Sequence, residues 1–341
     1  MKKTTICVVS FLSFLLTSQT ALSQKVGSTS MQFFKVMPSA RATALGDAYS
    51  VWASGAEAVF WNPAGIPLVE QSELSLTYLK WIFDTRQGAL SFATSFGSWG
   101  AVGLQLQYVD FGEIEEALWA SPFKDDITYP GLTGRTFRPH AYVIGLSYGS
   151  RITEKFSTGV TVKYARESLY NGQIVTAVTG QGETVDVKTW ANGLLFDFGL
   201  HYNTGFRTVR LAASVQNFGA NVKYASESNS IPMALRFGTA VDLVGTDALL
   251  TPSENSRLGL AFDLFQPNDY AQQMHMGAEY EFSNLVALRL GYKFNYDADG
   301  FTAGGGIKQG FGTMKLSFDY SFGALRYDLG NVHRISLGVG F

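Results

Sequence analysis

The sequence predicts an all-β protein: a transmembrane antiparallel β-barrel of about 14 strands with an N-terminal hatch of short helices and turns inside its lumen. Three features predict it: the composition, the long alternating segments, and an apolar stretch before them that does not alternate. Only 16% of the 341 residues are charged, 14% are aromatic and 36 are glycine. Soluble domains carry about 25% charged residues. A barrel whose apolar lipid-facing residues alternate with small or polar lumen-facing residues has this composition.

Residues 1–23 have the pattern of a secretory signal peptide. Two lysines precede an apolar segment over residues 6–16, and Ala21-Leu22-Ser23 offers a small-x-small cleavage site. The apolar segment is too short for a membrane-spanning helix, which needs about 20 residues. Cys7 lies inside this signal and is the only cysteine, so the mature chain has no thiol or disulfide chemistry.

Residues 24–72 are expected to form the hatch. The segment from Ser39 to Leu45 predicts one or two helical turns, and Ser54-Gly55-Ala56-Glu57 has the form of a capping box that starts a second short helix. Pro63 disfavours helical conformation at the residue before it and ends that helix.

This segment is too apolar for a disordered periplasmic tail, which should be polar. Since the outer face of a barrel contacts lipid, the lumen is the place left to bury its aromatic residues. We expect Phe60 and Trp61 to anchor the hatch, Asn62 to bond backbone groups at the turn, and Gly65 to allow a tight reversal toward the first strand.

Residues 73–341 are expected to form the barrel. Met314, Leu316, Phe318, Tyr320 and Phe322 illustrate the pattern, because every second residue in this stretch is apolar. Successive side chains of a strand point to opposite faces, so each such segment has one apolar face. A soluble sandwich would alternate in the same way. These segments, however, reach the roughly 9–11 residues that cross a bilayer, and aromatic residues recur at the ends of their apolar faces.

About fourteen such segments can be counted, an even number as in single-chain bacterial barrels. The expected starts lie near Glu73, Gln87, Trp99, Phe137, Lys155, Thr189, Phe206, Ser230, Arg257, Ala271, Leu285, Gly300, Gly312 and His333. With a periplasmic C-terminus, the long connections 112–136 and 168–188 are extracellular. Connection 242–256 is long but falls on the periplasmic side, which leaves the strand count open there. The alternating end of the chain, which stops on Phe341, resembles the C-terminal insertion signal of outer-membrane proteins.

Two N-terminal stretches resemble the signature of the PorV/PorQ family, which is related to the FadL-like outer-membrane transporters. They are Pro38-Ser39-Ala40-Arg41-Ala42 with Ala44-Leu45-Gly46-Asp47-Ala48, and Glu57-Ala58-Val59-Phe60-Trp61-Asn62-Pro63-Ala64-Gly65. The resemblance is close over about forty residues and extends into the first hairpin. It departs at Ala44-Leu45-Gly46, where the family often has Gly-Met-Gly. The hatch motif that it implies comprises Arg41, Gly46, Asp47, Phe60, Trp61, Asn62, Pro63, Ala64 and Gly65.

The resemblance implies two alternative functions in the cell outer membrane, where lipids surround the barrel. A PorV-like protein is an accessory component of type IX secretion that binds cargo C-terminal domains, the translocon, or both at its extracellular loops. A FadL-like protein is a channel for hydrophobic small molecules. Aromatic and apolar residues of the long loops suit protein contact. The candidate partner-binding residues are Trp119, Phe123, Tyr129, Leu132 and Tyr170.

Other classes of function have no support in the sequence. The net charge of -2 gives no basic surface for nucleic acid. The four histidines have no second ligand at metal spacing, no cofactor motif is present, and no nucleophile-base-acid motif predicts an enzyme. Six lumen-facing charged residues are expected to pair with each other or to tether the hatch. They are Lys163, Asp197, Asp263, Arg289, Lys293 and Asp319.

Overall fold

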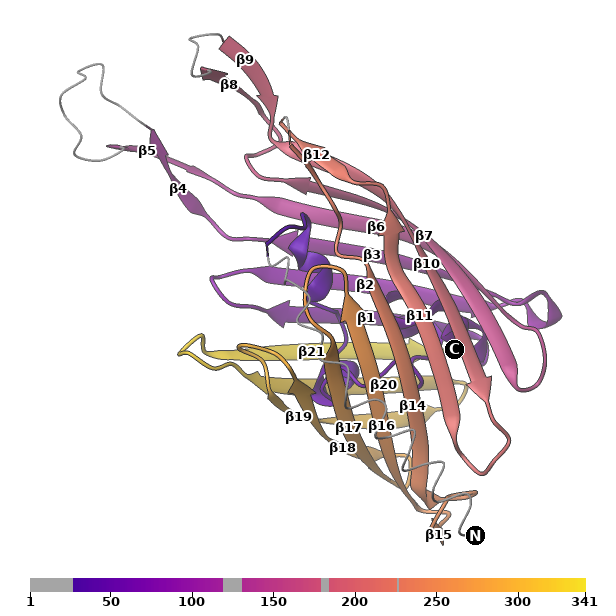
Figure 1. Ribbon diagram of the computed structural model, residues 1–341. Helices are drawn as coiled ribbons and strands as arrows, with labels where there is room; N and C mark the ends of the chain where they lie inside the picture. The colour runs from indigo at the N-terminus through magenta and orange to yellow at the C-terminus, as the bar shows by residue number, and fades with distance from the viewer. Residues whose placement is uncertain (1–26, 119–130, 179–183, 226) are drawn as a thin grey trace.

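A computed structural model describes residues 27–118, 131–178, 184–225 and 227–341. Fourteen strands form one closed antiparallel barrel, as the sequence predicts (Figure 1). Each wall strand pairs with the next along the chain, and β21 closes the ring on β1. The wall strands are β1 (Ser72–Lys80), β2 (Arg86–Ser95), β3 (Ala101–Asp110), β6 (His140–Arg151), β7 (Phe156–Ser168), β10 (Trp190–Asn203), β11 (Arg210–Gly219), β14 (Ala234–Gly245), β16 (Ser256–Pro267), β17 (Gln273–Phe282), β18 (Val286–Phe294), β19 (Phe301–Phe311), β20 (Met314–Ala324) and β21 (Asn331–Gly340).

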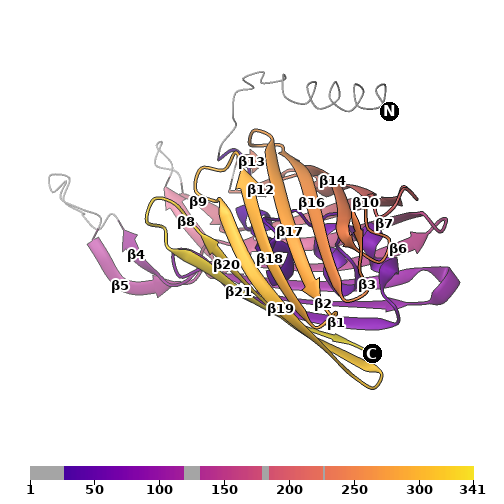
Figure 2. The ribbon, with the colours of Figure 1, turned by 90° about the horizontal axis from the view of Figure 1, so that it is seen from below.

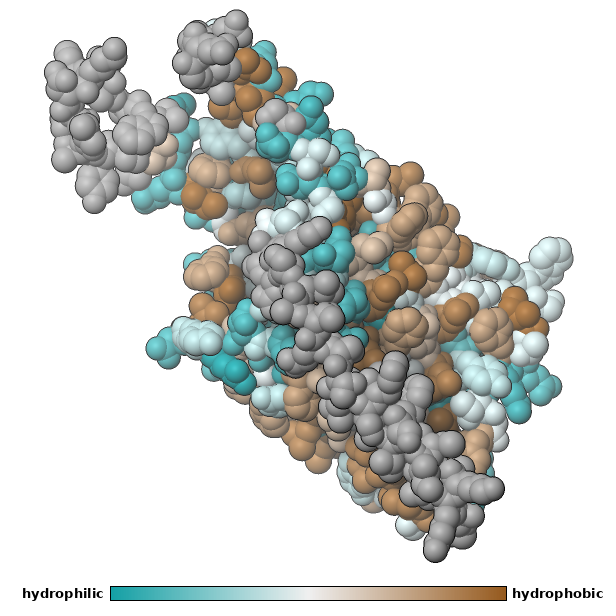
Figure 3. All heavy atoms as spheres, in the orientation of Figure 1, coloured by the Kyte–Doolittle hydropathy of each residue, from teal (hydrophilic) through white to brown (hydrophobic). Residues whose placement is uncertain are grey.

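The alternation of the sequence is the alternation of the two wall faces. In β1, Leu76 and Tyr78 point outward and are about half exposed, while Ser75 and Thr77 are buried inside. Such a strand places apolar side chains against lipid and small polar ones against the lumen contents. Figure 3 shows apolar residues spread over the wall and hydrophilic ones toward both ends, including the region of the protruding hairpins.

The two ends of the barrel differ in their connections. One end, here called the loop end, carries three two-stranded hairpins, of which β4–β5 and β8–β9 extend beyond the wall (Figure 1). They are β4 (Ile114–Leu118) with β5 (Gly131–Phe137), β8 (Ile174–Val178) with β9 (Thr184–Lys188), and β12 (Val222–Tyr224) with β13 (Glu227–Asn229). The first two correspond to the long connections predicted to be extracellular. The other end, here called the turn end, holds short turns, η4 (Gly97–Trp99) and the C-terminal Phe341.

The connection that left the strand count open lies at the turn end and does not change the count. β14 extends to Gly245, and Val244 pairs in parallel with Thr251 of the short strand β15 (Thr251–Pro252). The chain thus folds back onto its own strand before β16 starts, so a long turn is accommodated without an additional wall strand.

The hatch runs through the lumen from the loop end to the turn end. It begins with a parallel bridge between Thr29 and Ser230, next to β13. The chain then forms η1 (Gln32–Lys35), α2 (Ala40–Ala44), η2 (Gly55–Glu57), α3 (Ala58–Trp61) and η3 (Pro63–Leu68) before β1 begins. Figure 2 shows these indigo and purple turns enclosed by the wall strands. In the described part of the chain, no helix is long and apolar enough to cross a membrane.

The helix caps agree with the sequence at one site and differ at the other. The Ser39 hydroxyl accepts a hydrogen bond from the Ala42 N–H and caps α2. The predicted capping box at Ser54 is wrong, because the Ser54 side chain makes no cap bond. The Glu57 carboxylate instead accepts a hydrogen bond from the Tyr49 hydroxyl at 3.1 Å, so tertiary contact takes the side chain that a capping box would need.

Candidate functional site: the filled lumen and the loop end

The turn of the hatch motif is held by Asn62. Its Oδ1 accepts a hydrogen bond from the Ala64 N–H at 3.1 Å, which closes the turn at the start of η3. Its Nδ2 donates to the backbone carbonyls of Ser50 and Leu200, each at 3.2 Å. One amide side chain therefore joins the turn, a distant part of the hatch and wall strand β10. Only 1% of Asn62 is exposed, so water cannot reach its side chain. These three bonds satisfy the buried amide group instead.

Close backbone packing explains the small residues of the motif and of the facing wall. A Cβ on Gly65 would lie 1.9 Å from the Ala53 carbonyl oxygen. On the wall, a Cβ on Gly159 would lie 2.3 Å from the Pro63 oxygen, and one on Gly199 would lie 2.1 Å from Asn62 Oδ1. Glycines on β7 and β10 thus form a surface on which η3 packs without intervening side chains.

The two aromatic residues of the motif have different surroundings. Trp61 is fully buried, its indole N–H donates to the Pro38 carbonyl at 3.1 Å, and its ring meets Tyr49 edge-on at 5.6 Å. Arg236 lies over the same indole at 5.1 Å. Phe60 is only partly buried and packs at the margin of the same cluster. Trp61 therefore contributes more packing than Phe60 does.

The hatch is joined to the wall by a buried ion-pair cluster around Glu279. This glutamate of β17 accepts two hydrogen bonds from Arg41 of α2, at 2.8 and 2.9 Å. It also pairs with Arg257 at 2.8 Å and with Arg289 at 2.7 Å. Its side chain is 0% exposed, and two of its three guanidinium partners also pair with other lumen-facing carboxylates, so Glu279 is the centre of a shared charge network. Sequence reasoning did not single out Glu279. The alternation of β17 places it on the lumen face, and this was the one feature of the sequence that could have identified it.

A second connection lies where the hatch approaches β18. Gly46 and Asp47 both have positive φ angles, 64° and 65°. Asp47 pairs with Lys293 at 2.6 Å. A Cβ on Gly291, next to this pair, would lie 2.0 Å from the Gly46 nitrogen, so the backbones of hatch and wall are in direct contact. The other lumen-facing charges singled out in the sequence also pair, as Lys163 with Asp197, Arg236 with Asp263, and Arg289 with Asp319.

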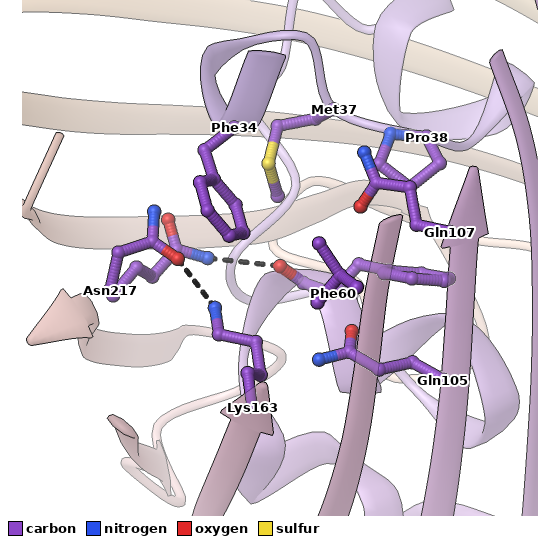
Figure 4. A pocket seen from close by; sticks show the side chains of 10 residues that line it. Phe34, Met37, Pro38, Phe60, Gln105, Gln107, Lys163 and Asn217 are labelled. Carbon is purple, nitrogen blue, oxygen red and sulfur yellow. Dashed lines mark hydrogen bonds between the residues drawn. The ribbon is translucent and has the colours of Figure 1, made fainter. Parts of the chain in front are cut away.

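The hatch is closely packed inside the wall, and Leu45, Trp61 and Ile66 are fully buried. One cavity of about 20 Å³ lies between Phe34, Met37 and Phe60 on the hatch side and polar wall residues such as Gln105 and Lys163 (Figure 4). This volume holds about one water molecule. A larger hollow of about 550 Å³ opens at the turn end, where Pro67 to Glu70 face the turns of the wall. The hatch, rather than an open passage, occupies the middle of the lumen.

The segment 28–36, here called the strap, lies across the loop end of the lumen. Phe33 and Phe34 stack with ring centroids 4.6 Å apart and join an apolar cluster with residues of β3, β6, β7 and β10. Asp269, in the turn between β16 and β17, accepts hydrogen bonds from Thr29 at 2.5 Å, Gln32 at 3.2 Å and Lys35 at 2.6 Å. Burial raises the pKa of Asp269, but these three donors outweigh it and hold the pKa below its usual value.

The lowered pKa of Asp269 predicts that its contacts hold the strap at neutral pH and are lost as the pH falls through that value. Asp269→Asn reproduces the uncharged state at neutral pH. Loss of a hydrogen bond to a charged group costs about 1.5 kcal/mol. We therefore expect trypsin to cut after Lys35 about tenfold faster in the variant. Asp297→Asn, in the neighbouring turn, is the control because Asp297 bonds Tyr270 and not the strap. Equal cleavage rates in both variants would show that Asp269 does not hold the strap.

The bases of the two long hairpins are tied together at the loop end. The Tyr170 hydroxyl donates to Glu116 of β4, and its ring lies 4.9 Å from that of Phe137. The Arg138 N–H donates to the Asn171 side chain at 3.0 Å. Tyr170, predicted as a partner contact, is thus engaged within the protein, and sequence reasoning missed the role of Glu116. Leu132 lies in β5, whereas Trp119, Phe123 and Tyr129 fall outside the described residues.

No group of three His, Cys, Asp or Glu residues that could hold a metal ion occurs within the described residues.

A family model described as “Type IX secretion system protein PorV” matches residues 19–254. No curated protein matches the sequence. Among solved structures, the Pseudomonas putida toluene transporter TodX aligns with a TM-score of 0.56 at 14% identity, over 87% of this chain and 95% of its own.

Two further solved structures are similar to the same extent. The CymD monoaromatic hydrocarbon channel aligns with a TM-score of 0.53 at 11% identity, over 89% of this chain and 96% of its own. A Pseudomonas aeruginosa FadL homologue aligns with a TM-score of 0.51 at 12% identity, over 89% and 98%. At these identities the likeness is one of fold.

Proposed function

We propose, from the premise that the chain belongs to the PorV family of type IX secretion system proteins, that this outer-membrane barrel binds the C-terminal domain of secreted cargo at its loop end. The family model spans the hatch and the wall as far as β14. The loop end faces the cell surface in this proposal, because its long connections contrast with the short turns beside the C-terminus. Components of the secretion system are the second class of partner.

The filled lumen is the observation that carries this proposal. The hatch is held by buried ion pairs around Glu279 and Asp47, and the cavity beside it has room for about one water. With the interior occupied by the hatch, the outer surface and the loops are what a partner meets, which supports binding at the loop end. The two tied hairpins extend furthest from the wall at the loop end (Figure 1).

The alternative function is a channel for hydrophobic small molecules. It is favoured by the likeness of fold to TodX, a toluene transporter, and to a FadL homologue. In this chain such a channel needs the hatch to move, which means separating Arg41 from Glu279 inside the lumen.

Deletion of the gene, complemented with chains of defined loop length, tests the two functions. In the deletion strain we expect cargo bearing C-terminal signal domains to accumulate in the periplasm, because its surface acceptor is missing. Wild-type chain should restore secretion. A chain with residues 112–137 and 170–189 replaced by short turns should not, although its heat-modifiable gel shift shows a folded barrel.

Uptake of toluene is measured in the same strains. Normal cargo secretion in the deletion strain, together with reduced toluene uptake, would reject the secretion function and support the channel. Loss of secretion with unchanged uptake is the expected outcome.

A further inference from the structure

The hairpin of β8 and β9 stands apart from every other sheet in the described part of the chain. It is a separate two-stranded sheet with five residues in each strand. Residues on both of its faces are open, since Ile174 is 56% exposed and Val175, which points the other way, is 38% exposed. An isolated two-stranded hairpin is only marginally stable in water, so an exposed one gains from a further strand.

The two outer edges of this hairpin differ in charge. β9 reads Thr-Val-Asp-Val-Lys and carries Asp186 and Lys188, the kind of residue with which natural sheets protect an edge from pairing. β8 reads Ile-Val-Thr-Ala-Val and has no charge, proline or glycine. The neighbouring hairpin has two glutamates in β4, Glu115 and Glu116. β8 is therefore an unprotected edge at the loop end.

The base of the hairpin is ordered before any partner arrives. The Leu169 N–H donates to the Thr189 carbonyl at 2.8 Å, and the Thr189 hydroxyl donates to the Gln173 carbonyl at 2.7 Å. On one face, the Thr176 hydroxyl donates to Asp186 at 3.1 Å and fixes the register of the two strands. A preset edge loses less conformational entropy on binding than a flexible loop does.

From these features we infer that the free edge of β8 binds an extended strand of the cargo domain by β-strand addition. The new strand bonds the outward backbone groups of residues 174–178. Its side chains contact Ile174 on one face and Val175 on the other, so an uncharged, β-branched strand fits best. This inference rests on the proposed function, because it names the way in which cargo is bound. A second copy of the chain is the other possible occupant.

Val175 and Val185 give a matched pair of variants. Both are valines on the same face of the hairpin, with exposed fractions of 38% and 44%, but Val175 lies on the open strand β8 and Val185 on β9. The probe is the purified C-terminal domain of a type IX cargo protein, titrated against the full-length barrel in detergent. Val175→Lys is expected to weaken binding at least tenfold because a lysine disfavours strand pairing at this edge. Val185→Lys should change binding less than twofold.

Amide hydrogen exchange of the wild-type barrel with the cargo domain supplies the second readout. Residues 174–178 are expected to gain protection, while residues 184–188 keep their rates, because only the open edge acquires new hydrogen bonds. Binding by wild type with equal affinities for both lysine variants would overturn strand addition and leave the proposed function in place. Absence of binding by wild type would overturn both. Dimers of the barrel that the Val175→Lys change abolishes, with cargo binding unaffected, would identify a second copy as the occupant and overturn the inference.

Discussion

Replacement of Glu279 by alanine is expected to destabilise the protein more than any other single change in the lumen. Glu279 is the shared acceptor of Arg41, Arg257 and Arg289, and its side chain has no exposed surface. Its removal leaves three guanidinium groups buried with reduced compensation. Removing one partner of a buried ion pair costs about 3–5 kcal/mol. The hatch should separate from the wall first, because Arg41 is the hatch residue that pairs with Glu279.

The measurement is the urea midpoint of unfolding for protein reconstituted in lipid vesicles, together with the heat-modifiable gel shift. Glu70→Ala is the matched control, since Glu70 and Lys315 form an ion pair in which the side chains are 78% and 66% exposed. An exposed pair contributes about 1 kcal/mol or less, so this midpoint should stay close to that of wild type. If Glu279→Ala unfolds at the same midpoint as Glu70→Ala, the cluster does not stabilise the fold.

Replacement of Gly291 by leucine is expected to convert a closed barrel into a conducting one. A Cβ at this position would lie 2.0 Å from the Gly46 nitrogen and 2.2 Å from the Leu45 carbonyl carbon, and both are backbone atoms that cannot rotate away. The wall is continuous through hydrogen bonds to β17 and β19, so the hatch is the part that moves. A displaced hatch exposes the charged lumen to water and ions.

Ion current through a planar lipid bilayer measures this change. Wild type should give no steady current, whereas Gly291→Leu should open channels. Gly88→Leu is the control, because Gly88 is also a strand glycine but a Cβ there would meet nothing within 4 Å. If none of the three proteins conducts ions, the hatch accommodates the leucine without leaving the lumen. The close contact at Gly291 would then not be what keeps the barrel closed.

The alternation of the sequence was sufficient to predict the wall. Every expected strand start lies within a few residues of an observed one, because a strand that separates lipid from lumen must change polarity at each residue. The hatch motif was visible for a related reason: Phe60 and Trp61 stand in a segment that can be neither strand nor long helix. Register and pairing partners were not visible, since alternation fixes which face a residue occupies but not its neighbour across the strands.

The failures of sequence reasoning share a cause. Ser54 and Glu57 have the spacing of a capping box, but the Tyr49 hydroxyl, eight residues away, bonds the glutamate instead. The role of Tyr170 as a partner contact stays a prediction, but sequence reasoning missed the hydrogen bond that its hydroxyl donates to Glu116 of the other hairpin. In both places the hydrogen-bond partner lies outside the local sequence pattern that was used for the prediction. Glu279 escaped notice because its three arginines come from separate segments, of which one is hatch and two are wall.

The bridge between Thr29 and Ser230 constrains how the molecule is assembled. The chain starts its described path at the loop end, runs the length of the barrel, and only at Ser72 begins the ring that encloses it. The N-terminal segment is therefore enclosed by a closed ring of strands. β21 cannot seal against β1 until the earlier segment has been passed between them or the sheet has curled around it. Pairing of β21 with β1 is thus the step after which the N-terminal segment can no longer enter the lumen between these two strands.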